Sequence, residues 1–93
     1  MARDMAYYTL TYRFADDYLG RRGPWRTEHL ALVGRFRDSG LLRMAGAYAE
    51  PADGALLVFE ARDAGEVAAF AKTDPYVREG LVVGWRVRRW MVV

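Results

Sequence analysis

The chain has 93 residues, of which 53% are hydrophobic and 14% aromatic, and its formal net charge is +2. This length fits one domain, which we expect to cover residues 1–93, and the composition is too apolar and too aromatic for a disordered segment. With no cysteine and a single histidine, the sequence excludes disulfide frameworks, thiolate nucleophiles and the usual multi-histidine zinc sites.

Charge and hydropathy bear on the location of the protein and on whether it binds membranes or nucleic acids. No apolar run approaches the ~20 residues that span a bilayer, and residues 1–5 do not lead into a signal-peptide core. The basic residues are almost all arginine and are scattered along the chain, which is more typical of solvated surface and ion pairs than of a nucleic-acid footprint. We therefore expect a cytoplasmic protein that binds neither membranes nor nucleic acids.

The first half of the chain predicts a strand, a loop and a helix. Residues Met5 to Tyr12 alternate and contain aromatic and threonine side chains that suit a pleated strand. Residues 13–23 are polar and predict a loop that ends at Pro24, which fits the first turn of a helix. From Trp25 apolar residues recur at helical spacing until Ser39-Gly40, where the glycine can take a left-handed C-cap.

The second half predicts a hairpin, a second helix and a last strand. Residues 41–49 and 55–61 are strand-like and are joined by turn residues that include a proline and a glycine. Asp63 can cap a helix that must end before Asp74, because a residue preceding proline is pushed out of the α region. A turn over residues 76–80 then leads to a long strand over residues 81–93, with a bulge expected at Gly84.

The resulting β-α-β-β-α-β order is that of an α+β, ferredoxin-like subunit, with two helices on one face of a four-stranded antiparallel sheet. We expect both faces of the third and last strands to be apolar, since Leu56 and Val58 alternate with Leu57 and Phe59, and Val83, Trp85 and Val87 alternate with Val82, Trp90 and Val92. Exposed apolar sheet of this extent normally marks an interface. The simplest closure is a homodimer that stacks sheet on sheet through the open face.

His29 is the one imidazole of the chain, and its helical phase places it within the stripe that faces the sheet. Imidazole takes and returns protons near neutral pH, as general acid-base catalysis requires. Arg26, one turn earlier, can present a cation to the same anionic ligand. The alternatives are a core histidine satisfied by a carbonyl or a tyrosine hydroxyl, and a solvated surface arginine.

Asp74-Pro75-Tyr76 is the second candidate constellation. A carboxylate beside an imidazole fixes its tautomer and stabilises the imidazolium, whereas aspartate before proline is also an ordinary helix start. The rigid proline would aim Asp74 and Tyr76 from one turn, so that Tyr76 lines the cavity of His29. We expect the two helices to run in the same direction, which would place His29 and Asp74 roughly 15 Å apart unless residues 75–80 fold back or the helices cross steeply.

Three short motifs resemble the YciI-like (YCII-related) family of bacterial proteins. They are residues 26–30 (RTEHL), Gly40-Leu41-Leu42 with Gly46, and Asp74-Pro75-Tyr76 with Gly80-Leu81-Val82. The resemblance implies a dimeric α+β barrel of ferredoxin-like subunits whose active site is centred on a His-Asp pair, here His29 and Asp74. It also implies relatives that act on aromatic or quinone-like compounds. One departure is Ala47, where family members often have proline.

The functional prediction is therefore a small-molecule enzyme of the isomerase or lyase type. His29 would transfer the proton, Asp74 would orient it, and Arg26 and Tyr76 would bind a small cyclic or aromatic substrate, with no cofactor and no metal. A non-catalytic ligand-sensing or accessory domain of the same dimeric fold is the alternative. An RNA-recognition module is disfavoured, because residues 55–61 lack the basic residue, the glycine and the first aromatic of its strand motif.

Overall fold

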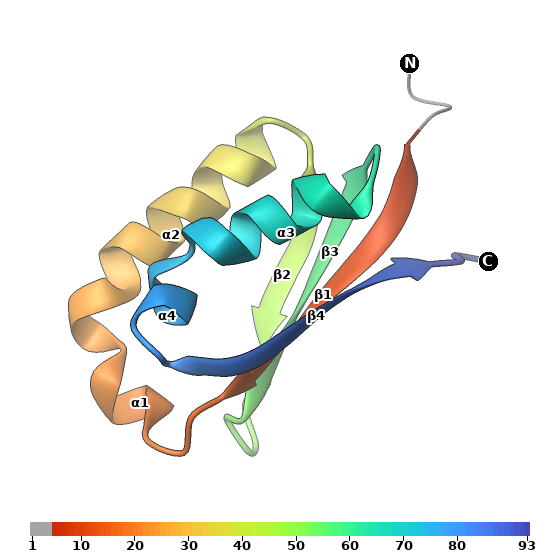
Figure 1. Cartoon of the computed structure of the whole chain (residues 1–93). Coiled ribbons are helices and arrows are strands. Elements are labelled where there is room, and N and C mark those ends of the chain that lie inside the picture. The colour runs from red at the N-terminus through yellow and green to blue at the C-terminus, as the bar shows by residue number, and fades with distance from the viewer. Residues whose placement is uncertain (1–4) are drawn as a thin grey trace.

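The structure is a computed structural model that describes residues 5–93. Four strands and two long helices form its framework (Figure 1). One single-turn helix lies between the first strand and the first long helix, and another lies between the second long helix and the last strand. In chain order the elements are β1 (Ala6–Phe14), α1 (Tyr18–Arg21), α2 (Gly23–Asp38), β2 (Leu42–Ala47), β3 (Gly54–Ala61), α3 (Ala64–Thr73), α4 (Pro75–Arg78) and β4 (Val82–Trp90).

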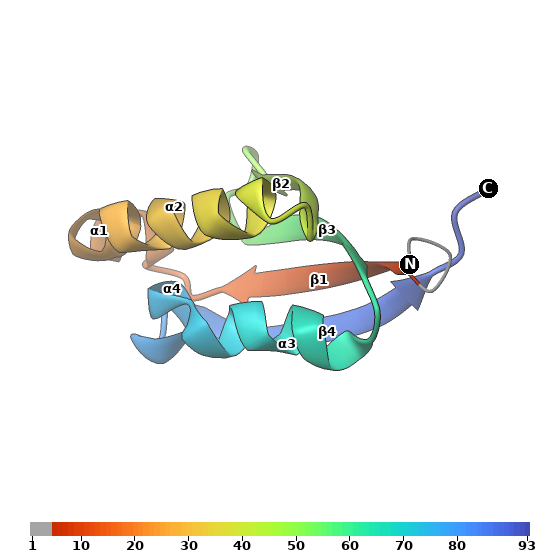
Figure 2. The same ribbon diagram turned by 90° about the horizontal axis from the view of Figure 1, so that it is seen from above.

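The strands form one antiparallel sheet in the order β2-β3-β1-β4, and the helices cover one of its faces. Figure 2 shows α2 over the β2 side of the sheet and α3 over the β4 side. The expected α+β ferredoxin-like subunit is confirmed. The core lies between the helices and the sheet, where Leu10, Phe59 and Phe70 are almost fully buried.

The expectation that the two long helices run in the same direction is wrong. β1 and β3 pair antiparallel, and each helix returns against the strand that precedes it, so α2 and α3 run in opposite directions (Figure 1). The end of α3 therefore lies beside the first half of α2. This topology, and not a foldback of residues 75–80, brings His29 and Asp74 together.

Local sequence signals produce most of the helix ends. Asp63 caps α3 by accepting a hydrogen bond from the Glu66 N–H at 3.0 Å, and Gly40 follows α2 with a left-handed φ of 87°. The loop predicted over residues 13–23 is wrong in part, because it contains α1. Tyr18 in α1 is buried and stacks on Phe14 with ring centroids 3.7 Å apart, so a tertiary contact holds this short helix in place.

The last strand also differs from its prediction. Phe14 pairs with Val82 and Arg13 with Gly84, so Val83 is an extra residue that forms the expected bulge one position early. Beyond it Trp85 and Val87 pack against the core, and Arg86, Arg88 and Trp90 take the open side, while Val92 lies past the strand. The expectation that both faces of β4 are apolar is therefore wrong: the bulge brings Val82 to the helix side with Trp85 and Val87, and the open side carries arginines.

Among residues 5–93, no helix is both long enough and apolar enough to cross a membrane.

Candidate functional site

Asp74 lies at the joint between α3 and α4, where Pro75 ends one helix and begins the next. Its side chain is 0% exposed and accepts three hydrogen bonds. Oδ1 accepts from the Tyr76 N–H at 3.0 Å and lies 2.9 Å from His29 Nδ1, and Oδ2 accepts from the Tyr12 hydroxyl at 2.7 Å. Asp74 is therefore both the helix cap and the partner of His29, because a carboxylate has enough lone pairs for both.

His29 occupies the first half of α2, and its side chain is 16% exposed. Its ring stacks on Tyr76 with centroids 3.9 Å apart and planes 6° apart, which fixes the plane of the imidazole. Because Asp74 is a carboxylate acceptor, Nδ1 carries the proton in neutral His29, and Nε2 has its lone pair free. Within residues 5–93, Nε2 has no hydrogen-bond partner.

Tyr12 is a residue of this site that the sequence did not indicate. It comes from β1, 62 positions before Asp74 in the chain, and its alternation with Leu10 and Phe14 is the ordinary pattern of a core strand. Burial, together with the nearby Asp74 carboxylate, raises the pKa of Tyr12 well above its usual range. The hydroxyl therefore stays protonated and donates to Asp74 at every pH at which the protein would work.

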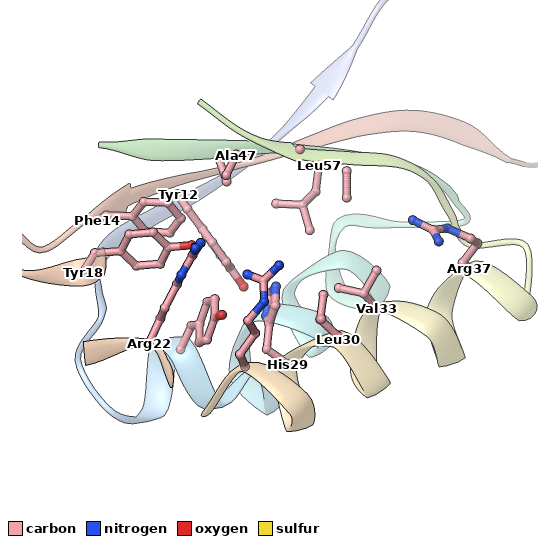
Figure 3. A pocket seen from close by; sticks show the side chains of 15 residues that line it. Tyr12, Phe14, Tyr18, Arg22, His29, Leu30, Val33, Arg37, Ala47 and Leu57 are labelled. Carbon is pink, nitrogen blue, oxygen red and sulfur yellow. The ribbon is translucent and has the colours of Figure 1, made fainter. Parts of the chain in front are cut away.

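A pocket of about 290 Å³ opens beside His29, between α2 and the β2 side of the sheet (Figure 3). This volume is close to the lower end of the ~300–1,000 Å³ found for small-molecule sites, so it suits a small ligand. Leu30 and Val33 line it from α2, and Leu57 lines it from β3. On β2 the lining residues Ala45, Gly46 and Ala47 are small, which leaves the space beneath the helix open.

Arginine side chains supply the charge of the pocket. Arg22, Arg26 and Arg37 all line it, and none forms a salt bridge with a carboxylate of residues 5–93. Arg26 was a candidate from the sequence, whereas Arg22 and Arg37 were missed. Arg22, the N-cap of α2, and Arg37, near its end, are spaced so that they share the face of His29, but scattered arginines elsewhere in the chain concealed that pattern.

Tyr76 lines the same pocket and is 1% exposed. Its hydroxyl oxygen is buried and has no hydrogen-bond partner within residues 5–93. Burial, together with the neighbouring Tyr18, raises the pKa of Tyr76, and the cations Arg26 and Arg22 oppose this shift. A buried hydroxyl without a partner costs about 1–3 kcal/mol, and the nearby Arg26 guanidinium is the charged group closest to offsetting this cost on the pocket side.

The site brings together His29, Asp74, Arg26 and Tyr76, the four residues selected from the sequence. No group of three or more His, Cys, Asp or Glu residues that could hold a metal ion occurs in the described part of the chain. The arrangement offers one proton acceptor, held by a buried carboxylate, beside cations and a tyrosine hydroxyl. Such a set can bind an acidic oxygen and move a proton.

The fold is similar to that of two solved structures. The first is 5-chloro-2-hydroxyhydroquinone dehydrochlorinase (TftG) from Burkholderia phenoliruptrix AC1100 in complex with 2,5-dihydroxybenzoquinone, with a TM-score of 0.77, 22% identity and coverage of 91% of this chain and 93% of that chain. The second is MtbAldR, with a TM-score of 0.55 and 12% identity over 96% of this chain, which spans only 55% of that one. At these identities the likeness concerns the fold.

No curated protein matches the sequence. The family model of the YCII-related domain, by contrast, matches residues 5–91, which is nearly the whole chain. The match includes all four strands and both long helices, together with His29 and Asp74. The protein thus belongs to the YCII-related domain family.

Proposed function

We propose that the protein is a cofactor-free enzyme of the lyase or isomerase type that acts on a small cyclic or aromatic compound with an acidic oxygen. The observation that carries this proposal is the relay from Tyr12 through Asp74 to His29, which ends at an open pocket whose arginines form no salt bridge with residues 5–93. A core histidine that served packing alone would not leave Nε2 free beside such a pocket.

His29 would act as the general base through Nε2. The substrate O–H or C–H proton moves to Nε2, and the electron pair of that bond stays on the substrate as an enolate or phenolate. In an isomerisation, the imidazolium returns the proton to another carbon. In an elimination, the imidazolium first returns the proton to the ring carbon that bears the leaving group, which gives a keto tautomer. Nε2 then takes the proton of a second hydroxyl, whose electron pair forms a carbonyl and expels the leaving group, and that proton later passes to water. The buried Asp74 carboxylate stabilises the imidazolium in both cases.

The cations would stabilise the negative charge that develops on the substrate. Arg26 and Arg22 line the pocket near the hydroxyls of Tyr76 and Tyr18, and Arg22 lies 5.6 Å from the Tyr18 ring centroid. Interactions that strengthen as charge develops lower the barrier, and removal of one such donor commonly costs about 10²–10³-fold in rate.

The structural neighbour TftG supports the reaction class. Its name describes a dehydrochlorinase of a hydroxylated aromatic ring, and its bound ligand is a dihydroxybenzoquinone. Loss of hydrogen chloride from such a ring needs a base and charge stabilisation, which His29 and the pocket arginines can supply. We propose a substrate of this class for the present protein as well.

A homodimer closed through the open sheet face is part of the proposal. Leu56 and Val58 of β3 alternate with core residues and so point to that face, next to the exposed Met44 of β2. The basic side chains of β4 confine the apolar part of the face to the β2 and β3 side. Two copies stacked there would remove these side chains from water.

The function can be tested with two compounds. The purified protein is incubated anaerobically with 5-chloro-2-hydroxyhydroquinone and chloride release is followed, while binding of 2,5-dihydroxybenzoquinone is measured by titration. We expect catalysed chloride release that falls about 10²–10⁴-fold in His29→Ala. Arg35→Gln, an exposed arginine of α2 outside the pocket, is the control and should leave the rate unchanged.

Each outcome separates the candidates. Binding without turnover would favour the ligand-sensing alternative over an enzyme of this specificity. If 2,5-dihydroxybenzoquinone does not bind and no chloride is released, the proposed substrate class is overturned. If His29→Ala leaves turnover intact, the proposed role of His29 is overturned.

A further inference from the structure

The pocket is elongated along α2 and has a cation at each end. Figure 3 shows Arg22 and Arg37 at opposite ends of the lining residues, with His29 between them. Arg37 follows His29 by eight residues in the same helix, which corresponds to about 12 Å along its axis. The proposed acid-base chemistry takes place between His29 and the Arg22 end, so it gives Arg37 no task.

The stretch between His29 and Arg37 is apolar. Leu30 and Val33 project from α2 along it, and Leu57 faces them from the sheet. Leu30 is 48% exposed, whereas Val33, one turn later, is buried, so Leu30 leaves an apolar side chain available for contact. The small side chains of Ala45 and Ala47 keep the opposite wall low. A ligand that lay here would contact hydrocarbon along its middle and charge at both ends.

We propose that the site takes a small phenolic or enolic ring that carries an acidic side chain, with the ring oxygen at His29 and Arg26 and a carboxylate at Arg37. This inference rests on the proposed function, because the ring is placed by the same base and cations. It adds the substrate's second anionic group and makes Arg37 a specificity-determining residue.

Charge and chemistry select a carboxylate for the far end. The Arg37 guanidinium has no salt bridge and no hydrogen bond to any residue between 5 and 93, although its planar shape matches a carboxylate in geometry. Arg35, in the same turn of α2, is also exposed but does not line the pocket. Substitutions of Arg35 and Arg37 remove the same charge from the same turn of α2, but only Arg37 lines the pocket. Comparing them therefore distinguishes a contact in the pocket from a general effect of positive charge.

The test compares ligands that differ only at the acidic end. Dissociation constants are measured for para-hydroxyphenylpropanoate and for its neutral amide, with the whole protein at low ionic strength. We expect the carboxylate to bind about fivefold more tightly, the upper end for an ion pair that is partly exposed. Arg37→Gln should abolish this preference, whereas Arg35→Gln should retain it. The preference should also shrink as salt is added.

The results distinguish this inference from the proposed function. If both ligands bind equally and binding depends on His29 and Arg26, the carboxylate subsite is wrong and the proposed function stands. If neither ligand binds although 2,5-dihydroxybenzoquinone does, the carboxylate subsite is overturned and the proposed function stands; if none of the three binds, both are overturned. A carboxylate preference that Arg35→Gln removes as fully as Arg37→Gln would show long-range attraction, and would also overturn the subsite.

Discussion

Replacing Asp74 with asparagine perturbs the site at its most buried point. The three hydrogen bonds that Asp74 accepts are charge-assisted, and such bonds contribute about 1.5–3 kcal/mol each, against about 0.5–1.5 kcal/mol for neutral ones. An asparagine carbonyl can still accept from the Tyr76 N–H and from His29, and its NH₂ group can donate to the Tyr12 hydroxyl if that hydroxyl rotates. All three hydrogen bonds are weakened, and the easier burial of a neutral side chain offsets part of this effect. We therefore expect the free energy of unfolding to fall by about 2 kcal/mol.

Asp74→Ala should cost more than Asp74→Asn, because it also removes the cap of α4 and leaves Tyr12 and His29 Nδ1 without a partner. The assay is urea unfolding at one fixed protein concentration, so that any dimerisation enters all variants equally. For a domain of this size, about 2 kcal/mol corresponds to a decrease in Tm of about 8–16 °C.

Asp63→Asn is the control, since Asp63 caps α3 with the same backbone contact but is exposed and has no histidine or tyrosine partner. Asparagine is as good a cap as aspartate, so its effect should be close to zero. The reasoning would be refuted if Asp74→Asn were as stable as Asp63→Asn, or if Asp74→Ala and Asp74→Asn unfolded together.

Three further predictions concern other parts of the molecule. The folded-state pKa of Tyr12 is raised above its ordinary value of 10.0, so the contribution of Tyr12 to stability is present below about pH 10 and is lost at higher pH. The urea midpoint of the wild type should therefore fall more steeply above pH 10 than that of Tyr12→Phe. Gly54→Ala should destabilise the fold by about 1–3 kcal/mol, because the new Cβ would lie 2.5 Å from the Tyr12 carbonyl oxygen. Gly46→Ala is the control and should not destabilise the fold, because its new Cβ meets nothing within 4 Å; equal thermal midpoints of the two variants would contradict this expectation. Val58→Lys should convert the proposed dimer into a monomer in light scattering, and a wild type that is already monomeric at micromolar concentration would contradict sheet-to-sheet closure.

The periodicity of the sequence determined the element order and the direction in which most side chains face. Alternation over residues 5–12 and helical spacing from Trp25 to Phe36 describe β1 and α2 as the structure has them, within a few residues. The caps at Asp63 and Gly40 were readable because their effect is local. Histidine and the Asp74-Pro75-Tyr76 turn stood out because each is chemically distinctive in a chain with one imidazole.

Contacts between distant segments were decided by the tertiary structure alone. The distance between His29 and Asp74 depends on the opposite directions of α2 and α3, which follow from strand pairing and not from either motif. Tyr12 reads as a core residue in sequence, and the hydrogen bond from its hydroxyl to Asp74 exists because β1 passes under the joint of α3 and α4.

The charged face of β4 and the position of Arg37 at the pocket also depend on the tertiary structure. A bulge at Val83 reverses which side chains face the helices, and one extra residue is enough because the strand period is two. Arg37 looks like any exposed arginine until the small residues of β2 leave a pocket beneath it. The sequence by itself thus determined the elements and the candidate chemical groups, and the packing of β1, β2 and the two antiparallel helices decided which groups meet.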